Sequence, residues 1–318
     1  MKKEIHYCDY TLRSKAALNA RSSRTAHSGA LIRVSDGDGV GYGCLHPWVD
    51  LGDLPLVDLL GVLRDGGTSP LVRAALACAK VDGEARSRGV SLFDDLTVPQ
   101  SHATVMMDEA AVDEAVTAGF DLIKLKMGRD LEAEREFLIT QIGRYPSVRW
   151  RLDFNGEGGE QWVRSFPRGV LERVDFIEDP CGHNDPCWRI LTEKYGVSAA
   201  VDRNVERGQG EASVLVIKPA VNFVQPLLER AYTENWRVVI TSYMDHPLGQ
   251  CFAAWRAGVA AREFPGTVGT CGLMTHGLFE PDEFTKAMAS PSPEFHSPAG
   301  TGLGFDNLLE NLPWKPLS

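Results

Sequence analysis

The chain has 318 residues, of which 43% are hydrophobic and 24% are charged, a composition typical of a globular protein with a sizeable buried core. Its net charge of −10 argues against a nucleic-acid partner. No apolar stretch is long enough to cross a membrane, and the amino terminus has no apolar core of a signal peptide. We therefore expect a cytoplasmic protein without a membrane partner, whose oligomeric state is left open.

The seven cysteines are scattered along the chain and form no C-x-x-C pair. An odd, scattered set argues against a disulfide framework and against a structural zinc site. Reduced thiols are therefore expected.

The first part of the chain has the pattern of a small α+β domain, which we assign to residues 1–97. Two of its predicted strands form a hairpin in which glycines alternate. These glycines resemble a phosphate-binding loop, but they do not join a strand to a helix, which argues against nucleotide binding. A helix is predicted from Pro70, which suits a first-turn position, through Ala79. The strands are predicted at 5–12, 30–34 and 39–44.

Beyond this domain, strands and helices alternate. Asp108 is placed to cap a helix that Gly119 ends, and 120–128 follows as a strand. Repeated strand–helix units of this length predict an α/β fold, a TIM-type (β/α)7β barrel over residues 98–282. The last segment, 283–318, is rich in Pro, Ser and Gly and is expected to pack back on the N-terminal domain. Later strands are predicted at 148–155, 174–180, 197–202, 214–219 and 237–242.

Charged side chains stand at the ends of five successive predicted strands. Lys124 and Lys126 share one face of the strand 120–128, although a parallel strand is normally apolar on both faces. Most of the charged residues are separated by about one strand–helix unit. Successive strands would therefore deliver them to the same rim, where TIM barrels build their active sites. The five strand-end residues are Lys126, Asp153, Glu178, Asp202 and Lys218.

Three carboxylates from adjacent strands are hard oxygen ligands suited to Mg²⁺. Lysines on either side of them would face a small-molecule carboxylate substrate from opposite directions. A metal-bound carboxylate has an acidified α-proton, because the cation stabilises the enediolate that deprotonation creates. Asn155 would support this site by a hydrogen bond or form a turn. Lys124 would contact a substrate carboxylate or pair with a ligand carboxylate.

Five short motifs contain these residues: LIKLK at 122–126, DFN at 153–155, IEDP at 177–180, VDRN at 201–204 and VIKP at 216–219. Together they resemble the enolase superfamily, and within it the muconate-lactonizing subgroup. The resemblance extends over essentially the whole chain and makes the N-terminal domain a capping domain. It implies that Asp153, Glu178 and Asp202 bind Mg²⁺. It also implies that Lys126 is the acid/base and that Lys218 faces the substrate from the other side.

Within the subgroup, the sequence is most similar to the o-succinylbenzoate synthase family. The grounds are its short length, the segment 22–29 in a flexible capping loop, and the segment 241–249 after a late strand. The implied reaction is the Mg²⁺-dependent syn dehydration of 2-succinyl-6-hydroxy-2,4-cyclohexadiene-1-carboxylate in menaquinone biosynthesis. Within 241–249, the run Met244-Asp245-His246 differs from the commoner form of this segment, which carries an acidic residue and a serine. Arg24, His27 and Ser28 would either close over the substrate as a lid or form an ordinary mobile polar loop. Ser242, in the late segment, is expected to bind the substrate.

Two other functions fit the same residues. An N-succinylamino acid racemase or dipeptide epimerase would use Lys126 and Lys218 as alternating bases on opposite faces of the substrate. Asp245 lacks the second aspartate that dipeptide epimerases usually carry after a late strand, which disfavours that version. A catalytically silent barrel that only binds a carboxylate is disfavoured because all five strand-end residues are present.

Overall fold

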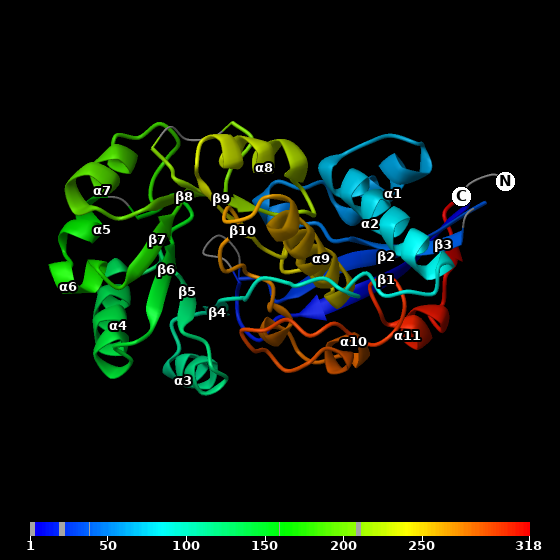
Figure 1. Ribbon diagram of the computed structural model, residues 1–318. Coiled ribbons are helices and arrows are strands. Elements are labelled where there is room, and N and C mark those ends of the chain that lie inside the picture. Colours follow the sequence, from blue (N-terminus) through cyan, green and yellow to red (C-terminus); the bar gives the residue numbers. More distant parts are fainter. Residues whose placement is uncertain (1–3, 19–22, 38, 159, 208–210) are drawn as a thin grey trace.

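The structure is a computed structural model that describes residues 4–18, 23–37, 39–158, 160–207 and 211–318. Figure 1 shows two parts, a barrel formed by the middle of the chain and an antiparallel sheet with two helices from its beginning. Within the described residues, every helix is too short or too polar to cross a lipid bilayer.

The N-terminal part is built on a four-stranded antiparallel sheet in the order β11-β1-β2-β3. The predicted hairpin is confirmed, and its glycines have a packing role. A Cβ at Gly41 or Gly43 would collide with backbone carbonyl groups of α2, so these glycines let the helix lie directly on β3. The elements are β1 (Glu4–Arg13), β2 (Ala26–Asp36), β3 (Gly39–Leu45), α1 (Leu56–Arg64), α2 (Pro70–Ser87) and β11 (Lys315–Pro316), with a 3-10 turn at Val49–Leu51.

The helix predicted from Pro70 is confirmed as α2, whose N-cap is Ser69. The carboxyl end of the chain returns to this part of the molecule, because β11 pairs with β1. The short helices before it lie beside the same sheet (Figure 1). These late elements are a 3-10 turn (His276–Leu278), α10 (Glu283–Ala287) and α11 (Asp306–Glu310).

The middle of the chain forms seven parallel strands in the order β10-β9-β8-β7-β6-β5-β4. The predicted α/β alternation is confirmed, with one exception, since β8 and β9 are joined by a connection without a helix among its described residues. The elements are β4 (Ala103–Val105), α3 (Glu109–Thr117), β5 (Leu122–Lys126), α4 (Leu131–Arg144), β6 (Arg149–Asp153), α5 (Glu160–Arg164), α6 (Arg168–Leu171), β7 (Val174–Glu178), α7 (Cys187–Tyr195), β8 (Ala199–Val201), β9 (Val214–Ile217), α8 (Val224–Thr233), β10 (Arg237–Ile240) and α9 (Pro247–Glu263).

The segment 268–272 joins the two edges of this sheet. Cys271 bridges to Ser101 next to β4, and Gly272 bridges to Thr241 next to β10, both in parallel register. Arg151 of β6 reaches across the interior and donates to the Thr270 carbonyl oxygen at 2.8 Å. An eighth, irregular strand therefore closes the (β/α)7β barrel.

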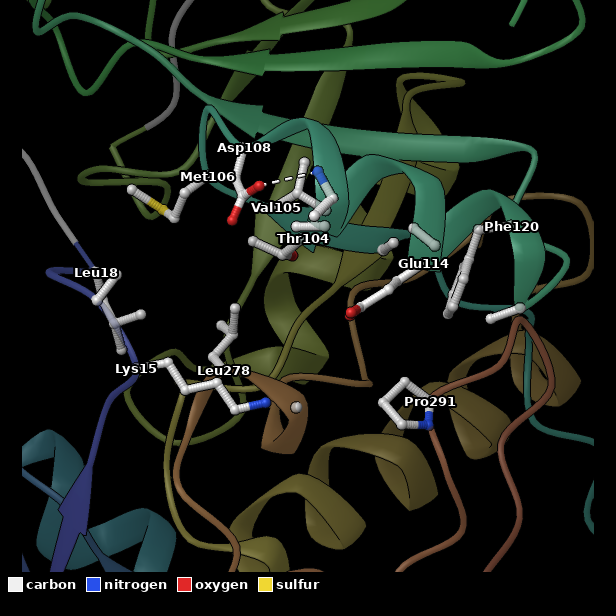
Figure 2. A pocket seen from close by; sticks show the side chains of 17 residues that line it. Lys15, Leu18, Thr104, Val105, Met106, Asp108, Glu114, Phe120, Leu278 and Pro291 are labelled. Carbon is white, nitrogen blue, oxygen red and sulfur yellow. Dashed lines mark hydrogen bonds between the residues drawn. The ribbon is translucent and has the colours of Figure 1, made fainter.

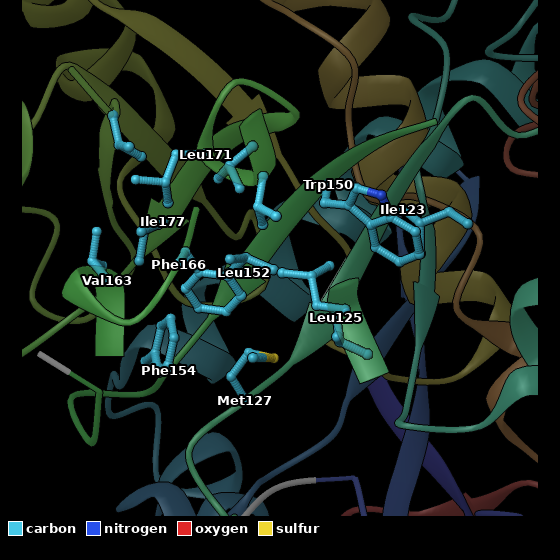
Figure 3. Packing of buried hydrophobic residues seen from close by; sticks show 14 of the residues in the cluster. Ile123, Leu125, Met127, Trp150, Leu152, Phe154, Val163, Phe166, Leu171 and Ile177 are labelled. Carbon is cyan, nitrogen blue, oxygen red and sulfur yellow. The ribbon is translucent and has the colours of Figure 1, made fainter. Parts of the chain in front are cut away.

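The alternation of side chains along each strand separates a dry outer layer from the barrel interior. Ile123 and Leu125 of β5 face outward with Trp150 and Leu152 of β6, where they pack under the surrounding helices (Figure 3). The residues between them face inward, including Lys124, Lys126 and Asp153. The burial of the outward apolar positions thus sets the register that turns the charged positions into the barrel.

One expectation about the cysteines is wrong. Cys181 and Cys187 form a disulfide in the loop between β7 and α7. The two residues are six positions apart in the sequence, but the turn at the start of α7 brings their side chains together. The scattered spacing therefore did not exclude a disulfide, because the geometry of the loop brings the two cysteines together without a C-x-x-C motif. The other five cysteines are free thiols.

Candidate active site

The structure confirms the predicted strand-end positions of the five charged residues. Lys126, Asp153 and Glu178 are the last residues of β5, β6 and β7, and Lys126 is the Cα partner of Asp153, which in turn is the partner of Glu178. Asp202 follows β8 directly, and Lys218 follows β9. Three neighbouring strands therefore present carboxylates, and a lysine stands on each side of them.

Ion pairs connect these side chains. Lys124 Nζ lies 2.9 Å from Asp153 Oδ2 and 2.6 Å from Glu178 Oε1. Lys126 Nζ lies 2.5 Å from the same oxygen of Asp153. On the other side, Lys218 Nζ lies 2.5 Å from Asp202 Oδ2. The Lys124 side chain is only 8% exposed, whereas those of Lys126 and Lys218 are 15% and 22% exposed, so the latter two are the lysines that solvent or a substrate can reach.

The lysines do not balance the negative charges of the three carboxylates equally. Burial alone would raise the pKa of Asp153, but Lys124 and Lys126 hold that pKa well below its usual range. Burial and the nearby charge of Asp153 raise the pKa of Glu178 to about 7. Burial opposes the charged form of Lys218, yet Asp202 outweighs it and raises the pKa of this lysine. The cluster therefore holds a buried carboxylate at Glu178 that the lysines leave partly uncompensated.

This donor set fits a divalent cation. Three carboxylates from adjacent strands are hard oxygen ligands, and added positive charge would relieve the repulsion around Glu178. In this structure, the oxygens of Asp153, Glu178 and Asp202 do not all lie within 4.8 Å of one another, and each residue bonds a lysine ammonium instead. Among the described residues, the group that does meet this distance is Cys181, Asp185 and Cys187, which includes the disulfide.

A cavity of about 330 Å³ lies at the carboxyl ends of these strands, and Asp202 lines it, whereas Asp153 and Glu178 lie outside its lining. Lys126 and Lys218 both line it, on opposite sides of the carboxylates. Asn155, for which the sequence predicted a supporting or turn role, lines it too and has a left-handed backbone with φ of 52°. No sequence signal pointed to Leu51, Val221 or Asn222, which also line this cavity. Arg203 and Tyr243 line it too and lie within the quoted segments 201–204 and 241–249.

Leu51 reaches the cavity from the N-terminal part because a set of hydrogen bonds holds its turn against the barrel. Tyr243, in the loop after β10, donates from its hydroxyl to Asp53 Oδ2 at 2.9 Å. Trp48 donates its backbone N–H to the same oxygen at 2.8 Å and its ring Nε1–H to the Tyr243 carbonyl at 2.7 Å. The Tyr243 ring also lies 5.8 Å from Lys218 Nζ. Tyr243 was within the quoted segment 241–249, but no sequence signal pointed to Leu51 or Asp53.

We expect Tyr243→Phe to loosen this contact between the two parts of the molecule. The variant leaves the Asp53 carboxylate without a hydroxyl donor, and a hydrogen bond to a charged group contributes about 1.5–3 kcal/mol. The free energy of unfolding from urea titration should fall by about 2 kcal/mol, and KM should rise because Leu51 is held less firmly. Tyr232→Phe, at an exposed position, is the matched control. Unchanged stability would mean that the hydroxyl contact is not formed in solution.

The structure does not bring the other predicted substrate-binding residues to this cavity. His27 and Ser28 belong to β2, where they pair with Leu12 and Thr11 of β1, so the expectation of a flexible loop there is wrong. His27 is buried, and its ring packs 4.4 Å from that of Trp48, centroid to centroid. Arg24 is exposed just before this strand.

Two positions of the predicted substrate-binding segments remain, Ser242 and Ser22. Ser242 is buried and shares a 2.7 Å hydrogen bond with the Thr275 hydroxyl, away from the cavity lining. Ser22, at the start of the expected loop, lies outside the described residues. The ladder between β1 and β2 explains the difference, because a local run of small polar residues resembles a loop until its distant strand partner is known.

A larger cavity of about 490 Å³ lies outside the barrel, beside α3 (Figure 2). Lys15 and Glu114 project toward it from opposite sides, between apolar residues such as Phe120 and Leu278 (Figure 2). None of the five strand-end residues lines it. Size alone would select this cavity, but the paired lysines and the carboxylates select the smaller one as the candidate active site.

Fold and site together define a class: an α/β-barrel protein with a cap, in which carboxylates flanked by lysines stand at the carboxyl ends of the strands. Known proteins agree with this description. Residues 5–85 match the family described as "O-succinylbenzoate synthase, N-terminal domain". An o-succinylbenzoate synthase from Bdellovibrio bacteriovorus is 30% identical to this chain, over 99% of this chain and 98% of that protein. The chain therefore belongs to the o-succinylbenzoate synthase family.

Solved structures share the fold at much lower identity. A dipeptide epimerase from Enterococcus faecalis is 17% identical with a TM-score of 0.76, and the match covers 96% of this chain and 99% of that one. A member of the enolase superfamily from Roseovarius nubinhibens, described as complexed with magnesium, is 16% identical with a TM-score of 0.74, over 100% of this chain and 99% of that one.

Proposed function

We propose that this protein is an o-succinylbenzoate synthase. It would convert 2-succinyl-6-hydroxy-2,4-cyclohexadiene-1-carboxylate into 2-succinylbenzoate and water, by syn dehydration through an enediolate, as a step of menaquinone biosynthesis. Family membership over nearly the whole chain supports the reaction. The observation that carries the mechanism is that Lys126 and Lys218 open into one cavity from opposite sides of three carboxylates.

Mg²⁺ is the proposed cofactor, with Asp153, Glu178 and Asp202 as its ligands. When bound, it supplies the positive charge that stabilises an enediolate next to the substrate carboxylate. The carboxylate of Glu178, which the lysines compensate only in part, and the magnesium in the R. nubinhibens structure of the same fold support this choice. Lys124 forms ion pairs with Asp153 and Glu178 and, like both of them, does not line the cavity, so we assign it to ligand pairing and not to the substrate.

The two cavity lysines have different roles in this reaction. Lys126 acts as the general base and removes the proton α to the substrate carboxylate. The ammonium thus formed then protonates the departing hydroxyl on the same face, which releases water and makes the ring aromatic. Lys218 stays protonated because Asp202 favours its charged form, and it attracts both the enediolate and the ring face.

A racemase or epimerase acting on N-succinylamino acids or dipeptides is the second candidate. Its support is the same pair of lysines on opposite sides, which is what proton removal on one face and return on the other require. The E. faecalis dipeptide epimerase also has the same fold.

Absorbance spectroscopy distinguishes the two proposals. We expect rapid loss of the cyclohexadiene absorbance with Mg²⁺ and none after EDTA has removed the cation. Absence of turnover with Mg²⁺ would contradict the synthase proposal. α-Deuterium exchange on N-succinylamino acids in D₂O would then test racemisation, with the same EDTA control.

A further inference from the structure

Asp179 joins the ends of the three strands that carry the carboxylates. Its two carboxylate oxygens accept the consecutive backbone N–H groups of Asp202 and Arg203, at 3.2 and 3.1 Å. Its carbonyl oxygen accepts the Gly156 N–H at 2.7 Å, and its own N–H donates to the Ala200 carbonyl at 3.0 Å. One residue thus bonds the chain just beyond β6 and just beyond β8, while it directly follows Glu178 of β7.

Asp179 itself does not reach the reaction cavity. It is only 4% exposed and does not line the cavity over Lys126 and Lys218. Its backbone φ of 42° lies in the left-handed region, which is strained for a residue other than glycine. A buried carboxylate next to Glu178 and near Asp202 also costs free energy through desolvation and repulsion. Such strain persists only where surrounding contacts hold the residue in place, and the hydrogen bonds of Asp179 do so.

We propose that Asp179 is a positioning residue, which holds the Asp202 main chain so that the Asp202 carboxylate meets both the cation and Lys218. This inference rests on the proposed metal site and deepens it. The Asp202 side chain has its own short contact to Lys218 Nζ, 2.5 Å from Oδ2, so a shift of the Asp202 backbone moves a proposed cation ligand and a cavity lysine together. Metal ligands commonly need such outer partners, whose loss costs about 10–100-fold in metal affinity or activity.

The pair of N–H donors explains why a carboxylate is required at position 179. A carboxylate offers an acceptor to each of two adjacent N–H groups, whereas an asparagine amide has one acceptor and would turn its NH₂ group toward the other donor. Asp179→Asn therefore keeps the size of the side chain but opposes one donor with another. The matched control is Asp94→Asn, an exposed aspartate between α2 and β4, whose carboxylate accepts the Ser91 N–H at 3.0 Å.

Two measurements test this inference. The first is the binding of Mn²⁺ to the full chain, monitored through the electron paramagnetic resonance signal of free Mn²⁺. The second is steady-state kinetics with Mg²⁺. For Asp179→Asn we expect the Mn²⁺ dissociation constant to rise by about 10–100-fold and kcat to fall, with little change in KM. Asp94→Asn should behave as the wild type in both measurements. If Asp179→Asn does not fold, Asp179→Ser, whose hydroxyl can accept one of the two N–H groups, replaces it with the same expected direction.

The outcomes separate this inference from the proposed function. Wild-type Mn²⁺ affinity and kcat in the folded Asp179 variant overturn the positioning role. Weakened Mn²⁺ binding in the variant supports that role even if the wild type does not dehydrate the cyclohexadiene substrate, a result that would overturn only the synthase proposal. A wild-type protein that binds no Mn²⁺ overturns the metal site and this inference together.

Discussion

Lys126→Ala is expected to abolish dehydration, with kcat reduced by at least about 10²–10⁴-fold, the range supplied by general acid–base catalysis. The reason is that the same amine both removes the α-proton and protonates the leaving hydroxyl. The fold should persist, because Asp153 keeps its 2.9 Å contact to Lys124 after Lys126 is truncated. Diene absorbance and thermal unfolding, recorded on the same preparation, are the measurements.

Arginine substitutions sharpen this prediction. Lys126→Arg retains the positive charge beside Asp153, but a guanidinium cannot be deprotonated in a protein, so this variant should also be inactive. Lys218→Arg should keep measurable turnover, because the role of that residue is to stay charged. Lys80→Ala, at an exposed position, is the control. An active Lys126→Arg enzyme would show that the charge and not the base function of Lys126 matters.

Asp202→Asn is expected to weaken Mg²⁺ binding at least about tenfold, the lower end of the range seen when even an outer partner of a metal ligand is removed. A neutral amide replaces a charged ligand, and Lys218 loses its 2.5 Å ion-pair partner at the same time. The concentration of Mg²⁺ that gives half-maximal turnover measures the effect. Titration with Mn²⁺ measures it without any substrate.

The fold of the variant should not change, because the Asp202 backbone N–H is held by Asp179 independently of its side chain. Asp113→Asn is a suitable control, since Asp113 forms its ion pair with Arg144 at the surface, and this variant should need no more Mg²⁺ than the wild type. An unaltered Mg²⁺ requirement in Asp202→Asn would remove Asp202 from the ligand set.

The two predictions depend on which lysines of the charged cluster pair only with carboxylates and which also line the cavity. Lys124 is the buried partner of two carboxylates, whereas Lys126 and Lys218 are shared between a carboxylate and the cavity. The cluster therefore has one lysine that serves the ligands and two that are open to a substrate. The sequence is compatible with both roles for Lys124, and the burial of this lysine favours pairing with the ligands.

Much of this arrangement follows from the sequence alone. The alternation of apolar and charged residues in 122–126 predicted two lysines on one face, and both do contact Asp153. The repeat of strand–helix units predicted the barrel and the common rim, because the carboxyl ends of parallel strands always meet at one end of a barrel. These features depend on local periodicity and chain direction, which a single sequence contains.

The remaining features required the tertiary structure, because each joins segments that are distant in the sequence or depends on how a loop turns. Pairing with β1 places His27 in a strand, against an expected loop. Leu51 reaches the cavity only because Asp53 and Tyr243 meet across the two parts of the molecule. The sequence thus determined which strands carry the charged residues. Tertiary contacts decided which side chains complete the cavity and which residue, Asp179, links the strand ends, because no local pattern encodes which distant N–H group a carboxylate will bond.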